Sequence, residues 1–320
     1  MFTAGATAYR ALLVSLTSPT VTCVIADRIM PFAVDIAEEL GVPAIAFRTA
    51  SACSYLAYLS FTNPIELGEF PFPSDDAVVG VAGMESFLRR RDLPRAIDPC
   101  VDGVLDPLLV THAEGISHER AARAVILNTA ASMEGPAISR IAPRVRDVFA
   151  IGPLHATSLA VMSHEEFTEF MSGLIAAGYP FLWVLRRDMV ETPPTSSALS
   201  EAVEAAAEGD RARIVEWAPQ QAVLRHRAVG CFLTHAGWNS TVEAAVEGVP
   251  MVCWPFFADQ LINSRFVGAV WRTGVDMKDV CDRETVERTV REAMESGEIR
   301  DRAEAMARQL RMDVDEGGSS

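Results

Sequence analysis

The chain has 320 residues, a net charge of −15 at pH 7, and 49% apolar residues. This length suits two domains of about 150 residues, each large enough to bury a core. The excess of negative charge repels phosphate backbones, so it argues against nucleic-acid binding. No run of about 18 uninterrupted apolar residues occurs, and we therefore expect no membrane span.

The first residues predict a helix rather than a signal peptide, because Arg10 interrupts the apolar stretch of 1–19 and no charged segment precedes it. The cysteines show no CxxC pairing and lie mostly in apolar runs, as reduced core thiols do. They are Cys23, Cys53, Cys100, Cys231, Cys253 and Cys281. We expect a cytoplasmic location, and the sequence indicates no oligomeric state.

Strands and helices alternate along the first half, which predicts an α/β fold. Strands are predicted at 21–26, 44–47, 124–128 and 148–151, and helices at 32–40, 51–59 and 103–123. Residues 63–99 are rich in proline, glycine and aspartate, which predicts a long surface loop. Gly152-Pro153 marks the predicted boundary between two domains, residues 1–153 and 154–320.

The second half continues the alternation. Strands are predicted at 181–185, 213–216, 231–234 and 251–254, a polar loop at 186–200, and helices at 164–177, 239–247 (beginning at Asn239 or Ser240) and 283–309. Only residues 155–163 separate the domain boundary from the first of these helices, and 157–162 predict a short strand.

The most informative segment is 217–260. Its apolar run 231–234 predicts a buried strand that ends at His235, and Gly237 permits a tight loop. The helix that follows ends at Glu247, before Gly248-Val249-Pro250. Free N–H groups at the start of such a helix, beyond the carboxyl end of a parallel strand, form an anion site. A diphosphate fits there without a metal.

Several of these residues also have a purely structural interpretation. Ser240 and Glu243 match a capping box, which would only satisfy N–H groups of the helix. His235 could be a hydrogen-bonded structural histidine, and Trp217 beside Pro219 could be plain packing. The sequence Asn239-Ser240-Thr241 also fits a glycosylation site, but its place at the start of a helix with apolar flanks disfavours that interpretation.

The 44 residues WAPQQAVLRHRAVGCFLTHAGWNSTVEAAVEGVPMVCWPFFADQ closely resemble the signature box of plant UDP-sugar glycosyltransferases, without insertion or deletion. The resemblance implies a GT-B fold, in which two Rossmann-like α/β domains face a cleft. Residues 1–153 would form a partial acceptor-binding domain and 154–320 the UDP-sugar-binding domain.

The resemblance also implies roles for single residues. Trp217 would stack on the uracil ring, the Ala218 backbone and Gln220 would contact its edge, and Glu243 would bind the ribose hydroxyls. The diphosphate would be held by His235, Gly237, Trp238, Asn239 and Ser240, which would stabilise its charge as it departs. Asp259 and Gln260 would bind the sugar hydroxyls, and a glutamine at the last position is typical of a preference for UDP-glucose.

Asp27 ends the strand Val24-Ile25-Ala26-Asp27 and matches the acidic member of the family's catalytic dyad. In the family it orients a histidine that deprotonates the acceptor hydroxyl. The alternatives are a helix-capping aspartate or one paired with Arg28. None of the six histidines stands in the expected sequence context, so we assign the base to none of them. They are His112, His118, His155, His164, His226 and His235.

These features predict an inverting, metal-independent O-glucosyltransferase that uses UDP-glucose, needs no cofactor, and acts on a small lipophilic hydroxyl or carboxyl compound such as a terpenoid or phenolic. They also predict a chain shortened at its beginning, at the linker and at its end. The alternative is a catalytically impaired remnant that still binds the nucleotide sugar. A nicotinamide oxidoreductase is disfavoured because no GxGxxG follows a strand.

Overall fold

The computed structural model describes residues 2–16, 20–27, 30–60, 74–93, 116, 121–152, 163–185, 211–277 and 280–314. The chain divides into two compact units. The first contains Met1–Leu154, Phe257–Asn263 and Met312–Ser320, and the second contains His155–Phe256 and Ser264–Arg311. Parallel strands alternate with helices in both units, as the sequence pattern predicts. No helix of the described part of the chain is long and apolar enough to cross a bilayer.

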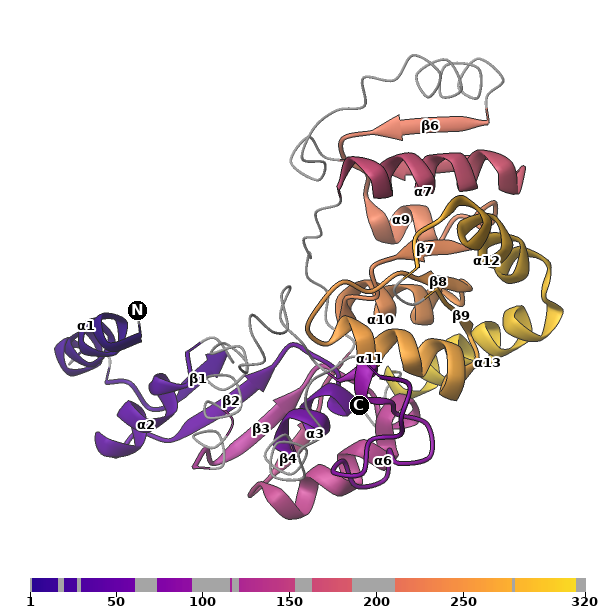
Figure 1. Cartoon of the computed structure of the whole chain (residues 1–320). Helices are drawn as coiled ribbons and strands as arrows, with labels where there is room; N and C mark the ends of the chain where they lie inside the picture. The colour runs from indigo at the N-terminus through magenta and orange to yellow at the C-terminus, as the bar shows by residue number, and fades with distance from the viewer. Residues whose placement is uncertain are drawn as a thin grey trace. The chain divides into compact units, whose positions relative to one another are not determined.

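The first unit is built on a four-stranded parallel sheet (Figure 1). Its strands, in spatial order, are β1 (Val24–Asp27), β2 (Ala44–Arg48), β3 (Ala124–Leu127) and β4 (Val148–Ala150). The four predicted strands are confirmed, although β1 begins three residues later than predicted and takes in Asp27. Because the strands are parallel, their carboxyl ends share one edge of the sheet, and Asp27 lies there.

Helices of the first unit connect these strands. They are α1 (Phe2–Ser15), α2 (Phe32–Glu39), α3 (Ala52–Leu59), α6 (Ala131–Ile141) and the short 3-10 turns η1 (Arg90–Asp92) and η2 (Ala142–Arg144). The predicted helices at the start of the chain, at 32–40 and at 51–59 are confirmed. The predicted helix 103–123 falls mostly outside the described residues. Nothing in the sequence pattern predicts α6, because Gly135 and Pro136 lie inside it.

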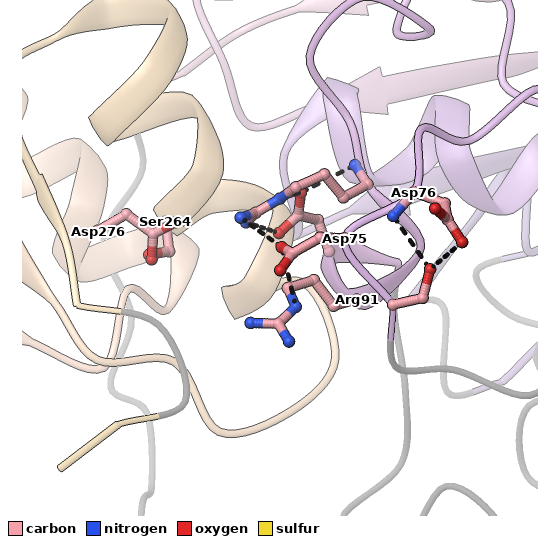
Figure 2. Close-up of polar contacts among 8 residues, drawn as sticks. Asp75, Asp76, Arg91, Ser264 and Asp276 are labelled. Carbon is pink, nitrogen blue, oxygen red and sulfur yellow. Dashed lines mark hydrogen bonds and ion pairs between the residues drawn. The ribbon is translucent and has the colours of Figure 1, made fainter.

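The prediction of a surface loop at 63–99 is confirmed only in part for its described residues 74–93, which are irregular apart from η1 but not wholly exposed. Five apolar side chains of this segment are almost fully buried: Val78, Val81, Met84, Leu88 and Leu93. The guanidinium of Arg89 binds Asp92 and also Asp75, 3.2 Å away. Asp75 in turn lies 3.3 Å from the Nε of Arg91 (Figure 2). The segment is therefore a packed part of the first unit, held by ion pairs on its outer side.

The second unit contains two parallel sheets. The smaller consists of β5 (Phe181–Val184) and β6 (Ala212–Val215), and the larger of β7 (Phe232–Thr234), β8 (Met251–Cys253) and β9 (Gly274–Asp276). The four predicted strands of this half are confirmed within one or two residues, and β9 is an addition. The predicted short strand at 157–162 and the polar loop at 186–200 lie outside the described residues.

The remaining helices are α7 (His164–Ala177), α9 (Gln220–Leu224), α10 (Trp238–Glu247), α11 (Gln260–Arg265), the π-helix η4 (Phe266–Trp271), α12 (Arg283–Glu295) and α13 (Gly297–Val314). The predicted helices at 164–177 and 283–309 are confirmed. The sequence pattern predicts neither α9 nor the π-helix. Ser264 at the end of α11 donates to Asp276 at the end of β9, at 2.7 Å (Figure 2).

The core of the second unit joins α7 and α12 to the strands. Phe167 of α7 stacks on Trp183 with ring centroids 5.1 Å apart, and Phe170 stacks on Trp254 at 5.0 Å. A Cβ on Gly173 would lie 2.5 Å from the Cβ of Val286 in α12, which leaves no room for a side chain. Glycine at this position therefore allows the two helices to pack closely.

Candidate functional site

The turn between β7 and α10 has a fixed backbone. Ala236 has a φ of +60°, a left-handed conformation that costs free energy for a residue with a Cβ. The backbone N–H of Ala236 donates to Oγ1 of Thr234 at 3.2 Å, and this bond holds the turn against the end of the strand. The side chains of Thr234 and Ala236 are both buried, so the turn is packed into the protein interior on that side.

The first turn of α10 begins at Gly237, which is the N-cap residue and has no side chain to cap the helix. The backbone N–H and the Oγ1 of Thr241 both donate to the Gly237 carbonyl, at 3.0 and 3.1 Å. The start of a helix carries the positive end of the dipole, which favours an anion. The anion site stays a prediction from the sequence.

The capping-box interpretation of Ser240 and Glu243 is wrong. The helix begins at Trp238, one or two residues earlier than predicted, so Ser240 lies in the first turn rather than at the cap. Both side chains instead accept hydrogen bonds from Nε2 of Gln220, at 3.2 Å to Ser240 Oγ and 2.6 Å to Glu243 Oε2. Both residues are 7% exposed, so the Glu243 carboxylate is largely buried and held by an amide.

The two tryptophans of the segment that are predicted to bind the donor have opposite environments. Trp238 is 3% exposed and its ring contacts that of Trp271, at the end of the π-helix, with centroids 6.2 Å apart. The side chain of Trp238 therefore cannot contact a ligand at the turn between β7 and α10, and only its backbone can. Trp217 is 74% exposed, which contradicts the plain-packing interpretation. An indole exposed to this degree offers a free face for stacking. Ala218 follows it directly, before the start of α9.

His235 follows the last residue of β7 and is partly buried. Burial lowers its pKa from the ordinary value of 6.5 to about 4, because the surroundings disfavour the charged form. The ring is therefore neutral at pH 7, with one nitrogen that donates and one that accepts. It can offer a hydrogen bond to a phosphate oxygen, but not a positive charge. Asn239, the second residue of α10, is also partly exposed.

Asp259 and Gln260 belong to the segment Phe257–Asn263, which groups with the first unit. Asn263 donates from Nδ2 to Oδ2 of Asp259 at 2.9 Å and so orients that carboxylate. The side-chain oxygen of Gln260 accepts from the backbone N–H of Phe257 at 3.2 Å, and Gln260 is 3% exposed. Sequence reasoning missed Asn263, although an asparagine four residues after an aspartate at a helix start is a usable signal.

Asp27 is the last residue of β1 and is partly exposed at the carboxyl edge of the first sheet. Its backbone carbonyl accepts from the N–H of Met30 at 2.9 Å, which begins the turn toward α2. The predicted partner Arg28 is outside the described residues, so the catalytic and structural interpretations of Asp27 both remain open.

Comparisons with known proteins show the family to which the chain belongs. A family model described as UDP-glucoronosyl and UDP-glucosyl transferase matches residues 148–303. The chain is 40% identical to 7-deoxyloganetic acid glucosyltransferase of Catharanthus roseus over 357 residues, covering 96% of this chain and 73% of the relative. It is 41% identical to myricetin 3-O-rhamnoside 1,2-glucosyltransferase of Crocosmia x crocosmiiflora over 359 residues, covering 98% and 74%. Both alignments exceed 320 residues, so the relatives carry insertions within the aligned span.

Solved structures give the same fold. A UDP-glucosyltransferase from Polygonum tinctorium, in complex with 3,4-dichloroaniline, has a TM-score of 0.82 and 24% identity, covering all of this chain and 78% of that one. Os79 from O. sativa in complex with UDP has a TM-score of 0.76 and 25% identity, covering 98% and 79%. These likenesses confirm the predicted GT-B fold class.

Proposed function

Because this chain belongs to the family of UDP-glucoronosyl and UDP-glucosyl transferases, we propose that it moves glucose from UDP-glucose to a small lipophilic acceptor. It is a UDP-glycosyltransferase by family. The observation that carries the donor assignment is the start of α10 at a glycine N-cap, beyond the carboxyl end of β7 and after the left-handed turn at Ala236. A diphosphate is the anion of the donor that matches such a helix start.

The donor's nucleoside is assigned to the segment just before α9. The uracil stacks on the exposed face of Trp217, with the Ala218 backbone and Gln220 at its edge. The ribose hydroxyls donate to the Glu243 carboxylate, which Gln220 already holds in one position. A carboxylate fixed before the ligand arrives loses less conformational entropy on binding.

In the transfer, the acceptor oxygen attacks the anomeric carbon as the bond from that carbon to the phosphate oxygen breaks. The configuration is thereby inverted, and the acceptor's proton passes to a base. The leaving UDP gains negative charge, which the N–H groups of α10 and neutral His235 stabilise by hydrogen bonds. These groups supply the stabilisation that a metal ion gives elsewhere, so we propose a metal-independent reaction without a cofactor. Asp259 and Gln260 bind the hydroxyl groups of the glucose.

The acceptor class rests on the relatives. The two that we describe are named for 7-deoxyloganetic acid and myricetin 3-O-rhamnoside, so each acts on a small organic molecule. A terpenoid or phenolic hydroxyl or carboxyl group is therefore the proposed acceptor. The cytoplasmic location stays a prediction from the sequence. The described cysteines, Cys23, Cys53, Cys231, Cys253 and Cys281, are all free thiols, and Cys23 is exposed.

Titration calorimetry with UDP, UDP-glucose and NAD tests the donor assignment. We expect heat with the two uridine nucleotides and none with NAD. Trp217→Ala should weaken UDP binding by about tenfold or more, because stacking of a base on an aromatic ring contributes about 1–3 kcal/mol. Binding of NAD without any response to UDP would contradict the proposal.

Transfer assays distinguish an active glucosyltransferase from a catalytically impaired remnant that only binds the nucleotide sugar. Pooled hydroxylated terpenoids and phenolics are incubated with UDP-glucose, with and without EDTA, and glucosides are detected by mass spectrometry, with His235→Ala as the control. Glucoside above the control supports the transferase. UDP binding without product supports the impaired remnant, which the sequence context of the histidines favours. Product that disappears with EDTA contradicts metal independence.

A further inference from the structure

Helix α9 is hydrogen-bonded to α10 at both of its ends. At the first end, Nε2 of Gln220 donates to Glu243 and Ser240. At the other end, Arg225 is the C-cap residue of α9, and its Nε and Nη2 both donate to Oε1 of Glu247, at 3.1 and 2.9 Å. Glu247 is the last residue of α10. The pair Arg225 and Glu247 lies outside the residues to which the resemblance assigns a role.

Glu247 is held in place from its other side as well. Nη2 of Arg311 in α13 lies 4.0 Å from Oε2 of Glu247 and donates to the carbonyl of Val246 at 3.2 Å. The Glu247 side chain is 11% exposed, whereas that of Arg225 is 72% exposed. A carboxylate at the carboxyl end of a helix opposes the dipole, and two arginines offset this cost. Glu247 is therefore the fixed partner, to which Arg225 attaches α9.

The two attachments together define an orientation. Residues 220 and 225 are about 7.5 Å apart along a helix axis, at about 1.5 Å per residue. One attachment at Gln220 would leave α9 free to pivot over α10, and the second attachment removes that freedom. Trp217 lies three residues before α9, and the turn at His235 to Gly237 leads into α10. The orientation of α9 on α10 thus sets where the exposed indole lies relative to that turn.

We propose that Arg225 and Glu247 are positioning residues that fix the distance between the nucleobase platform at Trp217 and the diphosphate turn. This inference rests on the proposed binding of a UDP-sugar. Neither residue touches the nucleotide. They act by holding two part-sites at the spacing of one UDP molecule, so that base and diphosphate are bound together rather than singly.

The inference predicts a selective effect. An ion pair with one exposed partner contributes little to global stability, so its loss should leave unfolding almost unchanged. Pyrophosphate needs only the turn on α10, and its affinity should not change. UDP needs both part-sites at the correct distance, and Arg225→Ala should lower its affinity by up to about fivefold, because an exposed ion pair contributes at most about 1 kcal/mol.

The experiment measures the dissociation constants of pyrophosphate and UDP by titration calorimetry for the intact chain. The variants are Arg225→Ala, Arg225→Lys, which keeps a cation, and Arg227→Ala, an exposed arginine two residues along, as the matched control. We expect the ratio of UDP to pyrophosphate affinity to fall in Arg225→Ala, to fall less in Arg225→Lys, and to stay unchanged in Arg227→Ala. Thermal unfolding of each variant shows that it is folded.

Three results overturn the inference. The first is an unchanged ratio in Arg225→Ala, and the second is an equal loss of pyrophosphate and UDP affinity. The third is the same change of ratio in Arg227→Ala. Failure of the proposed function has a different signature, because the unaltered chain would then bind UDP no more tightly than pyrophosphate.

Discussion

Two of the helix starts that follow the carboxyl end of a parallel strand are completed in different ways. In the first unit, α3 follows β2, and its first N–H groups are satisfied by the protein. Ser51 Oγ accepts from the N–H of Ser54 at 3.0 Å, and Glu134 accepts from those of Ala52 and Cys53, both at 2.8 Å. In the second unit, α10 follows β7 and begins at Gly237 without any side-chain cap from that residue.

Under the proposed function, the same local architecture stabilises the fold in one place and binds a ligand in another. Glu134 is 1% exposed and places a carboxylate where a ligand anion would bind to α10. Burial raises the pKa of Glu134, while hydrogen bonds from Cys53, Thr129 and Ala52 act in the opposite direction. A side chain of the protein therefore caps the start of α3, whereas the proposal assigns the start of α10 to a diphosphate.

The largest expected effect comes from removing the carboxylate of Glu134, which caps the start of α3. Glu134→Ala leaves two buried N–H groups without their acceptor, and we expect it to lower the free energy of unfolding by about 3 kcal/mol. Urea unfolding followed by circular dichroism measures this, with the exposed Glu38→Ala on α2 as the control. UDP affinity should not change in protein that is still folded. A loss of UDP affinity equal to that of a donor-site variant would show that the two helix starts are not independent.

The converse experiment introduces a side-chain cap at the start of α10. Gly237 has a φ of −58° and a ψ of 141°, a conformation that any residue adopts. Gly237→Asp should cap α10 as a carboxylate caps α3, and its charge should weaken UDP binding by about 100-fold, because like charges in contact cost several kcal/mol. Gly237→Asn supplies a cap without the charge and should weaken binding much less. Equal affinities of the two variants for UDP would show that charge is not what the site selects.

The smallest expected effect is a change in pH dependence. His235 has a pKa lowered to about 4 by burial, so below pH 6.5 the unfolded chain binds more protons than the folded one. Stability is therefore fully present above pH 6.5 and falls as the pH drops towards 4. His235→Asn should remove about 2 kcal/mol of the loss between pH 7 and pH 5. Urea unfolding at the two pH values measures it, and identical pH dependence in both proteins would contradict a buried neutral His235.

The sequence predicts best those elements that have clear start and stop signals. The helix at 164–177 has a capping box at Ser163 and Glu166 and a left-handed Gly178 at its end, and prediction and structure agree at both ends. The end of α10 at Gly248 follows the same rule. The start of α10 is less predictable than its end, because a glycine N-cap carries no side-chain signal. The pair Ser240 and Glu243 also has the sequence pattern of a capping box that begins three residues further on.

Other features depend on contacts that a linear pattern does not contain. The burial of residues 74–93 follows neither a helical nor a strand period, so only the ion pairs of Arg89 and the packed apolar side chains reveal it. Glu134 has a φ of −129° and a ψ of 23° inside α6, and its role in capping α3 links residues about 80 positions apart. The resemblance predicted Glu243 and Gln220 as binding residues, but not that they hold each other.

The left-handed alanine at 236 has a further consequence. Its methyl group is fully buried, and glycine would adopt the same backbone angles at lower cost. A methyl group also restricts the loop, so under the proposed function less motion would be frozen out when phosphate oxygens bind. Rigidity at one position would thus trade folding stability for readiness to receive the donor.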